Sequence, residues 1–431
     1  MSKKAKILLT IVVLAAIFLR FYNLKYIEFN LDQAANSIIT EQAIANYGLT
    51  QNCLLSSIHV CNPFFFPYLL VLPMLISPDP LFLTGFIALI NVFSVLLLFF
   101  FAKKFFGETA ALISSALLAV NPWAIIFSRT IWQQNVLIFF TILFFWFLFN
   151  FAFGNKKNHL IWAFLFLGII SQLHQLAMAF AALLLACLII FRKNVTFKNL
   201  LIGFLLCLAL YLPFITFEVK NNWYSFENVI SYGKLPSELH TAALLYPFQM
   251  VGTGGLDYTF GADYQNFLNT TPNWPILNTF LIIIFAAGLV FLAWKRQPEY
   301  LIILIWFFLL PLALIFSKTT VYPHYFIIGI PAAFIVLGVL FSNLPKKIFL
   351  IIPIIFILYQ AVISFAYLSF PAGRQCVLGN HSQPYIYKLE NIKKILATGE
   401  KDLDKIHKQS CNCNVCEPLT TWYILEEVIN K

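Results

Sequence analysis

The sequence predicts an all-α polytopic membrane protein. Of its 431 residues, 61% are hydrophobic and only 11% are charged, whereas a soluble domain carries roughly 25% charged residues. Apolar stretches of about 20 residues, long enough to cross a bilayer as helices, recur along the chain. A soluble globule of this size is excluded because the chain has too few polar side chains to cover its surface.

The first predicted span covers residues 7–24. It follows Lys3, Lys4 and Lys6, as the apolar part of a signal peptide would. No small-residue cleavage site follows it, and Arg20 and Phe21 extend it, so we interpret it as a retained anchor. Further spans are predicted at residues 80–102, 108–128, 133–153, 159–173, 175–191, 198–217, 276–294, 299–316, 322–342 and 347–369, which gives about 11 transmembrane helices.

The two short spans 159–173 and 175–191 could form a hairpin at His174 or one long tilted helix, and the choice sets the orientation of every later span. A hairpin places half of the 28 basic residues at one side of the membrane, near span ends. This asymmetry is typical of cytoplasmic loops, and it favours the hairpin with a cytoplasmic N-terminus. The residues concerned are Lys3, Lys4, Lys6, Lys103, Lys104, Lys156, Lys157, Arg192, Lys193, Lys198, Lys295, Arg296, Lys346 and Lys347.

Three longer polar pieces fall on the opposite, extracytoplasmic side. They are loop 25–79, loop 218–275 and the tail 370–431, so residues 1–369 are expected to form one transmembrane domain with a small extracytoplasmic tail. Within the first loop, the apolar but proline-broken segment 62–77 is expected to be re-entrant or interfacial, since irregular backbone is tolerated at membrane depth only against protein or water.

The net charge of +10 would suggest nucleic acid in a soluble protein. Here about half of the basic residues are topology anchors and others lie in the tail among acidic residues, so no nucleic acid is expected as a partner. The expected surroundings are membrane lipids.

Six of the eight cysteines lie outside the predicted spans, all on the side expected to be oxidising: Cys53, Cys61, Cys376, Cys411, Cys413 and Cys416. This distribution favours structural disulfides, with Cys53–Cys61 plus two bridges in the tail whose pairing the sequence does not decide. The alternative is a zinc site made by the tail cysteines with His381 or His407.

Two polar clusters lie at the outer ends of early spans. The first comprises Glu28, Asn30, Asp32, Gln33, Asn36 and Glu41, and a helix over 32–47 would place Gln33, Asn36 and Thr40 on one face. A carboxylate beside a lipid surface can have a raised pKa, which suits a general base; the alternative is a solvated loop face. The second cluster, in Asn121–Asn135, contains Arg129, which either reaches to lipid headgroups or binds a phosphate through two hydrogen bonds.

Two more clusters lie farther along the chain, at Ser171–Gln175 around His174 and at Lys318–Tyr325. A histidine in such a hairpin is often only a structural hydrogen-bonding group, and the tyrosines could belong to an interfacial aromatic belt. All four clusters map to one face of the membrane, which indicates an outward-facing cavity. A pore would instead place ionisable residues in the middle of its spans.

These clusters also carry a family resemblance. The chain resembles the family 39 class of membrane glycosyltransferases with the GT-C fold, which includes protein O-mannosyltransferases and aminoarabinose–lipid A transferases. The resemblance covers roughly residues 7–370. The matching motifs are Arg20–Leu24 with Phe29–Ala34, Asn62–Leu69, Asn121–Asn135, Gln172–His174, and Tyr322–Tyr325 with Pro331.

The resemblance implies an inverting transfer of a hexose or pentose from a polyprenyl-phosphate-linked donor to an extracytoplasmic acceptor (protein, lipid or cell-envelope glycan) at the plasma membrane. Asp32 corresponds to the catalytic aspartate of the family. Arg129, His174, Lys318 and His324 would bind the donor phosphate. The substrate cavity would include Glu28, Gln33, Asn36, Trp132, Gln134, Asn135, Tyr322 and Tyr325.

Two departures from the family pattern concern carboxylates. Gln33 stands where the family usually has glutamate, and Gln134 and Asn135 stand where many members have a second acid. A tightly bound divalent metal prefers several anionic oxygens, so neither a metal nor another cofactor is expected. The departures leave Asp32 as the candidate base.

Three other functions compete with this one. A polysaccharide polymerase or ligase would use the same class of donor, but loop 218–275 contains no arginine for such a reaction. A transporter or flippase of lipid-linked substrates would show charges in the middle of its spans or two matched halves. A non-catalytic assembly protein would tolerate the altered acid positions.

Overall fold

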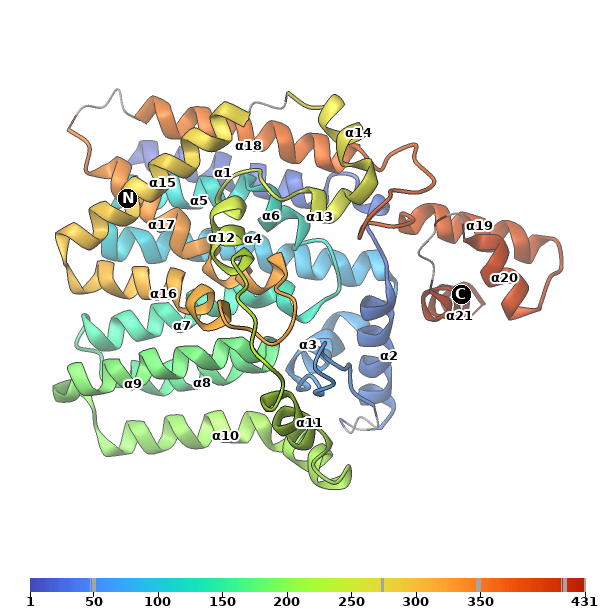
Figure 1. Ribbon diagram of the computed structural model, residues 1–431, viewed down its shortest axis with the longest axis horizontal. Coiled ribbons are helices and arrows are strands. Elements are labelled where there is room, and N and C mark those ends of the chain that lie inside the picture. Colours follow the sequence, from blue (N-terminus) through green and yellow to red (C-terminus); the bar gives the residue numbers. More distant parts are fainter. Residues whose placement is uncertain are drawn as a thin grey trace.

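The computed structural model describes residues 1–46, 48, 52–272, 275–345, 350–411, 413 and 417–429, and within them it contains helices, turns and isolated bridges but no strand. Figure 1 shows a bundle of roughly parallel helices, with the N-terminus at one end and the C-terminal tail beyond the other. The helices before the second loop are α1 (Lys3–Phe21), α2 (Leu31–Ala45), α3 (Phe65–Met74), α4 (Pro80–Phe106), α5 (Glu108–Val120), α6 (Pro122–Ile126), α7 (Leu137–Ala152), α8 (His159–Leu173), α9 (Phe180–Ile190) and α10 (Phe197–Lys220).

The later part of the chain adds four short helices in the second loop, four helices of the bundle and three in the tail. They are α11 (Tyr224–Gly233), α12 (Ala242–Val251), α13 (Asp257–Phe260), α14 (Tyr264–Asn269), α15 (Pro275–Lys295), α16 (Pro298–Leu314), α17 (Ile330–Ser342), α18 (Ile351–Ser369), α19 (Tyr385–Ala397), α20 (Leu403–Ser410) and α21 (Pro418–Ile429). Short 3-10 segments include η1 (Leu24–Tyr26), η2 (Gln133–Val136), η3 (Gln175–Ala179) and η6 (Pro323–Gly329).

Among the described residues, 6 helices are long and apolar enough to cross a membrane. They are Pro80–Phe106, Gln133–Ala152, Phe197–Lys220, Pro275–Lys295, Pro323–Ser342 and Ile351–Ser369. Shorter apolar helices occupy other predicted spans, among them His159–Leu173 and Pro298–Leu314. The all-helical membrane architecture is therefore confirmed, whereas the number of about 11 spans stays a prediction.

The helix α5 packs most extensively against α4 and α17, and it also contacts α1 and α18. Small residues permit this close approach: a Cβ added at Gly338 of α17 would lie 2.4 Å from Ser114 Oγ of α5. Ser114 Oγ also donates to the Phe334 carbonyl of α17, at 3.0 Å. Small residues and interhelical hydrogen bonds of this kind are how helices associate where the surrounding lipid is as apolar as the core.

The predicted span 108–128 is interrupted. The helix α5 ends at Val120, and Asn121 has an extended backbone before the short helix α6 begins at Pro122. A proline disfavours a helical conformation in the residue before it, and Asn121 Oδ1 accepts the first free amide of α6, from Ala124, at 3.0 Å. The break turns residues 127–135 across the outer end of the bundle.

Two other expectations about backbone can be compared with the structure. The helix α8 ends at Leu173, and after His174 the chain continues through η3 into the separate helix α9, as a hairpin requires. Segment 62–77 forms only the ten-residue helix α3, which packs against α2 and α8. It is too short to span a bilayer.

Candidate active site

The helix α2 begins so that Asp32 stands in its first turn. Asn30 is its N-cap, and Asn30 Oδ1 accepts the amide of Gln33, at 3.4 Å. An N-cap satisfies one of the free amide groups of a helix start and fixes where the helix begins. Asp32 is half-buried and points into a cavity, while Gln33 and Asn36 are buried against the chain that follows α6.

Gln33 joins the two chain segments that meet at the site. Its Nε2 donates to the Glu28 carbonyl at 3.1 Å, and its Oε1 accepts the Ile131 amide at 3.1 Å. An ionised glutamate could accept but not donate, so only the amide serves both contacts. The departure from the family pattern at this position therefore has a structural reason in this chain.

Asn36 and Gln133 continue the same contact between α2 and the 130–135 segment. Asn36 Nδ2 donates to Gln133 Oε1 at 3.4 Å and to the Asp32 carbonyl at 2.9 Å. Asn135 is also buried, and its Nδ2 donates to the Thr130 carbonyl at 2.9 Å. Gln33, Asn36 and Asn135 thus hold the backbone of the site, and Gln33 also lines the cavity into which Asp32 points.

Two cavities meet at Asp32 and Trp132, which line both of them. We call the first the tail cavity. It encloses about 310 Å³ and lies among the first loop, the 258–259 segment and the C-terminal tail. Its lining is Glu28, Phe29, Asn30, Leu31, Asp32, Gln33, Ile126, Phe127, Thr130, Trp132, Tyr258, Thr259, Gly379, Asn380, Ser382, Gln383, Lys388, Glu417 and Thr420.

The second, which we call the histidine cavity, encloses about 380 Å³. It lies where α8, α16 and the segment before α17 end at the outer side of the bundle. Its lining is Asp32, Leu54, Leu55, Ser56, Ser57, Ile58, Asn62, Trp132, Gln133, Gln134, His174, Gln175, Leu176, Tyr232, Leu314, Ser317, Thr319, Tyr322, His324 and Tyr325. Asp32 is therefore accessible from two sides.

Aromatic rings surround the two histidines of this cavity. The centroid of the His324 ring lies 4.6 Å from that of Trp132 and 4.4 Å from that of Tyr325, and its plane is parallel to that of Tyr322 at 5.7 Å. The His174 ring meets Tyr325 edge-on at 5.3 Å. Four of these five residues come from the motifs around 174 and 322–325, which are far apart along the chain but adjacent in the structure.

The protonation of His174 follows from its contacts. Burial lowers the pKa of His174 to about 4, so the ring is neutral. Its Nδ1 accepts the Leu176 amide at 3.3 Å, so the proton of the neutral ring is on Nε2, which can donate. Within the part of the chain that the structure describes, His324 Nδ1 and Gln134 Oε1 are buried without a hydrogen-bond partner. Such unsatisfied groups at a cavity indicate a ligand or water that would satisfy them.

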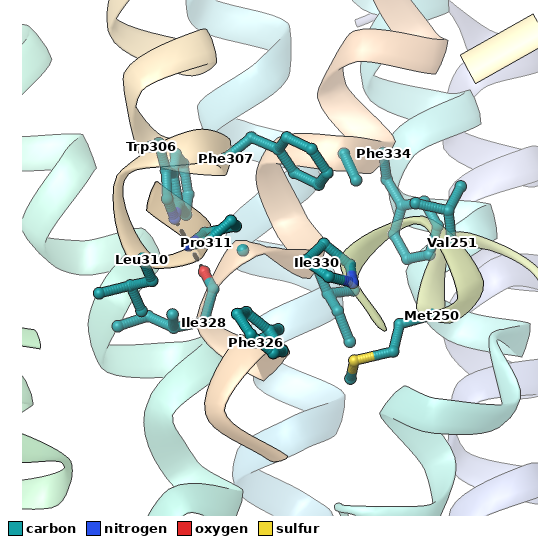
Figure 2. Close-up of a pocket in the computed structure, with 13 residues that line it drawn as sticks. Met250, Val251, Trp306, Phe307, Leu310, Pro311, Phe326, Ile328, Ile330 and Phe334 are labelled. Atoms are coloured by element: carbon teal, nitrogen blue, oxygen red, sulfur yellow. Dashed lines mark hydrogen bonds between the residues drawn. The ribbon is translucent and has the colours of Figure 1, made fainter. Parts of the chain in front are cut away.

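The segment η6, which carries His324, is held by a contact with α16. Figure 2 shows Trp306 of α16 beside η6, where its Nε1 donates to the Ile328 carbonyl at 2.8 Å. The apolar space around this contact, among Met250, Leu310 and Phe334, encloses only about 10 Å³. That volume holds at most a single water, so this region supports the site and does not bind a substrate.

Carboxyl groups dominate the charge of the tail cavity. Burial, together with the charge of Glu417, raises the pKa of Asp32. Burial and the charge of Asp32 raise the pKa of Glu28 to about 8. With a pKa of about 8, Glu28 carries a proton at neutral pH. No group of three metal-binding side chains occurs among the residues described.

Arg129 contacts backbone carbonyls, and its contact with a donor phosphate stays a prediction. Its Nη1 donates to the carbonyls of Arg20 and Tyr22, at 2.8 and 2.7 Å, and its Nη2 donates to that of Asn23, at 2.9 Å. It is only 6% exposed and lines neither the tail cavity nor the histidine cavity. Arg129 is the clamp that holds the chain leaving α1, because the end of a helix leaves carbonyls that need donors.

We expect Arg129→Leu to lower the free energy of unfolding by about 2 kcal/mol or more, since it removes the donor from the Arg20 and Tyr22 carbonyls at a cost of roughly 1–3 kcal/mol each. The Asn23 carbonyl still accepts the Tyr26 amide, at 3.0 Å. Thermal unfolding of the purified protein in lipid nanodiscs measures the effect. Lys25→Leu removes an exposed cation from the same segment and should leave the unfolding temperature unchanged. An Arg129→Leu protein as stable as the wild type would show that Arg129 does not stabilise the chain that leaves α1.

Lys318 contacts the end of α11, and its contact with a donor phosphate also stays a prediction. Its Nζ donates to the Gly233 carbonyl at the end of α11, and its amide donates to the Tyr232 hydroxyl at 3.2 Å. Lys318 does not line the histidine cavity, although Ser317 and Thr319 do. It fastens α11 over the rim of that cavity.

Disulfides link parts of the outer segments. Cys53 pairs with Cys61 in the first loop, and Cys376 pairs with Cys413 in the tail. Cys411 is disulfide-bonded as well, whereas Cys416 lies outside the described residues. Cys376 and Cys413 are therefore not available as thiolate ligands for the alternative zinc site.

Sequence reasoning missed the tail residues of the site. Lys388 of α19, Glu417 and Thr420 line the tail cavity beside Asp32, and Lys388 Nζ donates to Thr420 Oγ1. The tail is fixed to the rest: Asp263 Oδ2 accepts the Leu378 amide at 2.7 Å, and Asn380 Nδ2 donates to the Tyr258 carbonyl at 3.0 Å. The sequence signal was a lysine on the apolar face of an amphipathic helix, together with Tyr385 and Ile392.

Comparison with known proteins shows which family this chain resembles in sequence. Residues 62–217 match the model of the dolichyl-phosphate-mannose-protein mannosyltransferase family. A putative mannosyltransferase, YkcB of Bacillus subtilis, is 36% identical over 127 residues, which make up 28% of this chain and only 17% of that protein.

Solved structures resemble the whole chain. ArnT from Cupriavidus metallidurans bound to undecaprenyl phosphate superposes with a TM-score of 0.59 at 13% identity, over 97% of this chain and 75% of ArnT. The oligosaccharyltransferase of Archaeoglobus fulgidus superposes with a TM-score of 0.60 at 15% identity, over 95% of this chain and 57% of that one. The resemblance found in the sequence is thereby confirmed: the chain shares the GT-C fold of these two structures, and its residues 62–217 match the mannosyltransferase family model.

Proposed function

We propose that the protein is an integral-membrane inverting glycosyltransferase that moves a hexose or pentose from a polyprenyl-phosphate-linked donor to an extracytoplasmic acceptor. The observation that carries the proposal is the position of Asp32 between two cavities. A general base must lie within hydrogen-bond reach of the acceptor's proton while the acceptor attacks the donor, so it belongs where the two substrates meet.

The histidine cavity is the donor site. Its walls are the outer ends of membrane helices, and Leu176 and Leu314 line it beside the histidines, so a lipid can reach it from the bilayer. The tail cavity is the acceptor site, because its walls are the first loop, the 258–259 segment and the tail. The bound undecaprenyl phosphate in the ArnT structure supports a lipid phosphate as the donor's leaving group.

In the reaction, the acceptor's hydroxyl oxygen attacks the anomeric carbon from the side of the tail cavity, and Asp32 accepts its proton. The bond between the anomeric carbon and the phosphate oxygen breaks, and its electron pair stays on the departing lipid phosphate. The transition state resembles an oxocarbenium ion. N–H groups of His174 and His324, with the hydroxyls of Tyr322 and Tyr325, stabilise the negative charge that grows on the phosphate.

Arg129 and Lys318 take part only through the backbone. Arg129 holds the carbonyls after α1 and so fixes the loop that leads to Asp32, and Lys318 fixes α11 at the rim of the donor site. Neutral hydrogen-bond donors therefore replace cations around the phosphate in this proposal. In a water-poor site they are effective because they are already oriented before charge develops.

We place the protein in the plasma membrane with its N-terminus in the cytoplasm and the active site outside. The basic residues at the span ends support a cytoplasmic N-terminus. The tail lies at the opposite end of the bundle from the N-terminus (Figure 1), which would place it outside. Disulfides at the tail end also support it, because they persist in oxidising compartments.

The acid side of the pH profile should report on Asp32. Transfer requires the ionised carboxylate, so the rate falls as the pH falls through the pKa of Asp32, which burial and the charge of Glu417 raise above its ordinary value. Glu417→Gln removes the second cause and should move this fall to lower pH. Initial rates of transfer between pH 4 and 8 measure it. An acid limb that stays in place in Glu417→Gln protein would argue against Asp32 as the base.

The direct test is binding and turnover of lipid donors by the purified protein in nanodiscs. We expect undecaprenyl phosphate to bind, as measured by native mass spectrometry, and at least one radiolabelled sugar of a panel of polyprenyl-phosphate hexoses and pentoses to be consumed. The product should have the anomeric configuration opposite to that of the donor. Absence of both binding and consumption would refute the proposed function.

A further inference from the structure

The tail cavity has a composition that indicates what it binds. Most of its lining side chains carry a hydroxyl, amide or carboxyl group, and aromatic rings of Trp132, Tyr258 and Phe127 interrupt them. Sites for small polar ligands combine a few oriented polar groups with aromatic walls in this way. Hydroxyl groups of a ligand can donate to the carboxylates and accept from the amides and from Lys388.

The charges exclude some acceptors. The carboxyl groups of Glu28, Asp32 and Glu417 all line the cavity, and Lys388 is the one cation among the described residues that line it. Lys388 is only 3% exposed, and its Nζ already donates to Thr420 Oγ1. A phosphate or carboxylate bound here would lie among three carboxyl groups and a single cation, so acidic groups would disfavour it, whereas Lys388 keeps N–H donors for a neutral hydroxyl.

The shape of the cavity disfavours a peptide. Extended peptides bind along a sheet edge or in an open groove, where backbone hydrogen bonds hold them. The described residues contain no strand, and the walls of the cavity are loops and helix ends. A volume of about 310 Å³ accommodates a compact ring with its substituents.

We propose that the tail cavity takes a neutral sugar ring of a glycan as the acceptor, and that Lys388 and Glu417 of the tail select it. This inference rests on the proposed function, which it deepens by naming the class of acceptor. Lys388 donates a hydrogen bond to one ring hydroxyl and Glu417 accepts one from another, which turns a further hydroxyl toward Asp32. That hydroxyl forms the new glycosidic bond and loses its proton to Asp32.

The tail is suited to select an acceptor because it is held in place. The Cys376–Cys413 disulfide closes it, the Tyr385 amide donates to the Ile27 carbonyl at 2.9 Å, and the Tyr423 hydroxyl donates to the Pro78 carbonyl at 2.9 Å. Figure 1 shows α19, α20 and α21 standing beside α2 at the end of the bundle. Side chains on such a rigid wall can recognise a substrate with little cost in entropy.

The test compares three acceptor probes with the full-length protein in nanodiscs and a consumed polyprenyl-phosphate sugar. They are p-nitrophenyl glycosides of neutral hexoses, p-nitrophenyl glucuronide, and a decapeptide rich in serine and threonine. We expect label to be transferred to at least one neutral glycoside and to neither of the other two. We further expect Lys388→Met and Glu417→Gln to raise KM for that glycoside at least tenfold, with KM for the donor within twofold of wild type.

Lys393→Met is the matched control, because Lys393 lies exposed on the same helix; it should change neither KM. Transfer to the peptide or the glucuronide, or to no glycoside while undecaprenyl phosphate binds, would overturn the inference and leave the proposed donor chemistry intact. Equal effects of Lys388→Met on both KM values would also overturn it. Failure of undecaprenyl phosphate to bind would count against the proposed function itself.

Discussion

Replacing Asp32 with asparagine is expected to reduce sugar transfer by about 10²–10⁴-fold, the usual contribution of a general base. Asparagine has nearly the same shape as aspartate but cannot accept a proton at neutral pH. Asp32 is half-buried at the junction of both cavities, and no ion pair holds it among the described residues. The substitution therefore removes the base without breaking a structural contact of its side chain.

The measurement is the initial rate at saturating donor, with equal amounts of folded protein. Undecaprenyl phosphate should still bind to the Asp32→Asn protein, which separates loss of chemistry from loss of fold. Asp257→Asn changes an exposed carboxylate of α13 that lines neither cavity, and it should retain the wild-type rate. A wild-type rate in the Asp32→Asn protein would end the assignment of Asp32 as the base.

Much of the site could be predicted because local sequence determines it. Asn30 followed by Asp32 and Gln33 is a helix start, so the position of Asp32 in the first turn of α2 follows from capping preferences. The basic residues indicated which ends of the spans are cytoplasmic. Four clusters from distant parts of the chain could therefore be assigned to one face of the membrane. The structure then shows that residues of all four line the two adjoining cavities.

The contacts that the sequence does not predict join residues that lie far apart in it. Arg129 binds backbone carbonyls at the end of α1, and backbone acceptors leave no sign in a sequence. Lys388 and Glu417 reach Asp32 only because the tail docks on α2, which helical periodicity in the tail cannot reveal. The break at Asn121, in contrast, was predictable, since Pro122 disfavours a helical residue before it.

The second large effect is expected at His324. In the His324→Asn protein the rate should fall by about 10²–10³-fold, the usual effect of removing one preorganised donor to a developing negative charge. His324 lies between Trp132, Tyr322 and Tyr325, and its Nδ1 has no partner among the described residues. The interaction forms only as the phosphate departs, so kcat and kcat/KM should fall together, with little change in KM for the donor.

His59→Asn is the control for this change. His59 is exposed on the first loop with a positive φ of 54°, a conformation that asparagine tolerates, and it should keep the wild-type rate. An unaltered rate in the His324→Asn protein would mean that the departing phosphate does not lie in the histidine cavity. The assignment of donor and acceptor sites would then be reversed.

A double-mutant cycle shows whether the two histidines act on one phosphate. Both rings contact Tyr325, at 5.3 Å from His174 and 4.4 Å from His324. If they stabilise the same oxyanion, the loss in the His174→Asn, His324→Asn protein is smaller than the product of the two single losses, because residues that act as a unit are not additive. Multiplicative losses would mean that each histidine acts on a different group. His174 would then position the sugar, and only His324 would act on the phosphate.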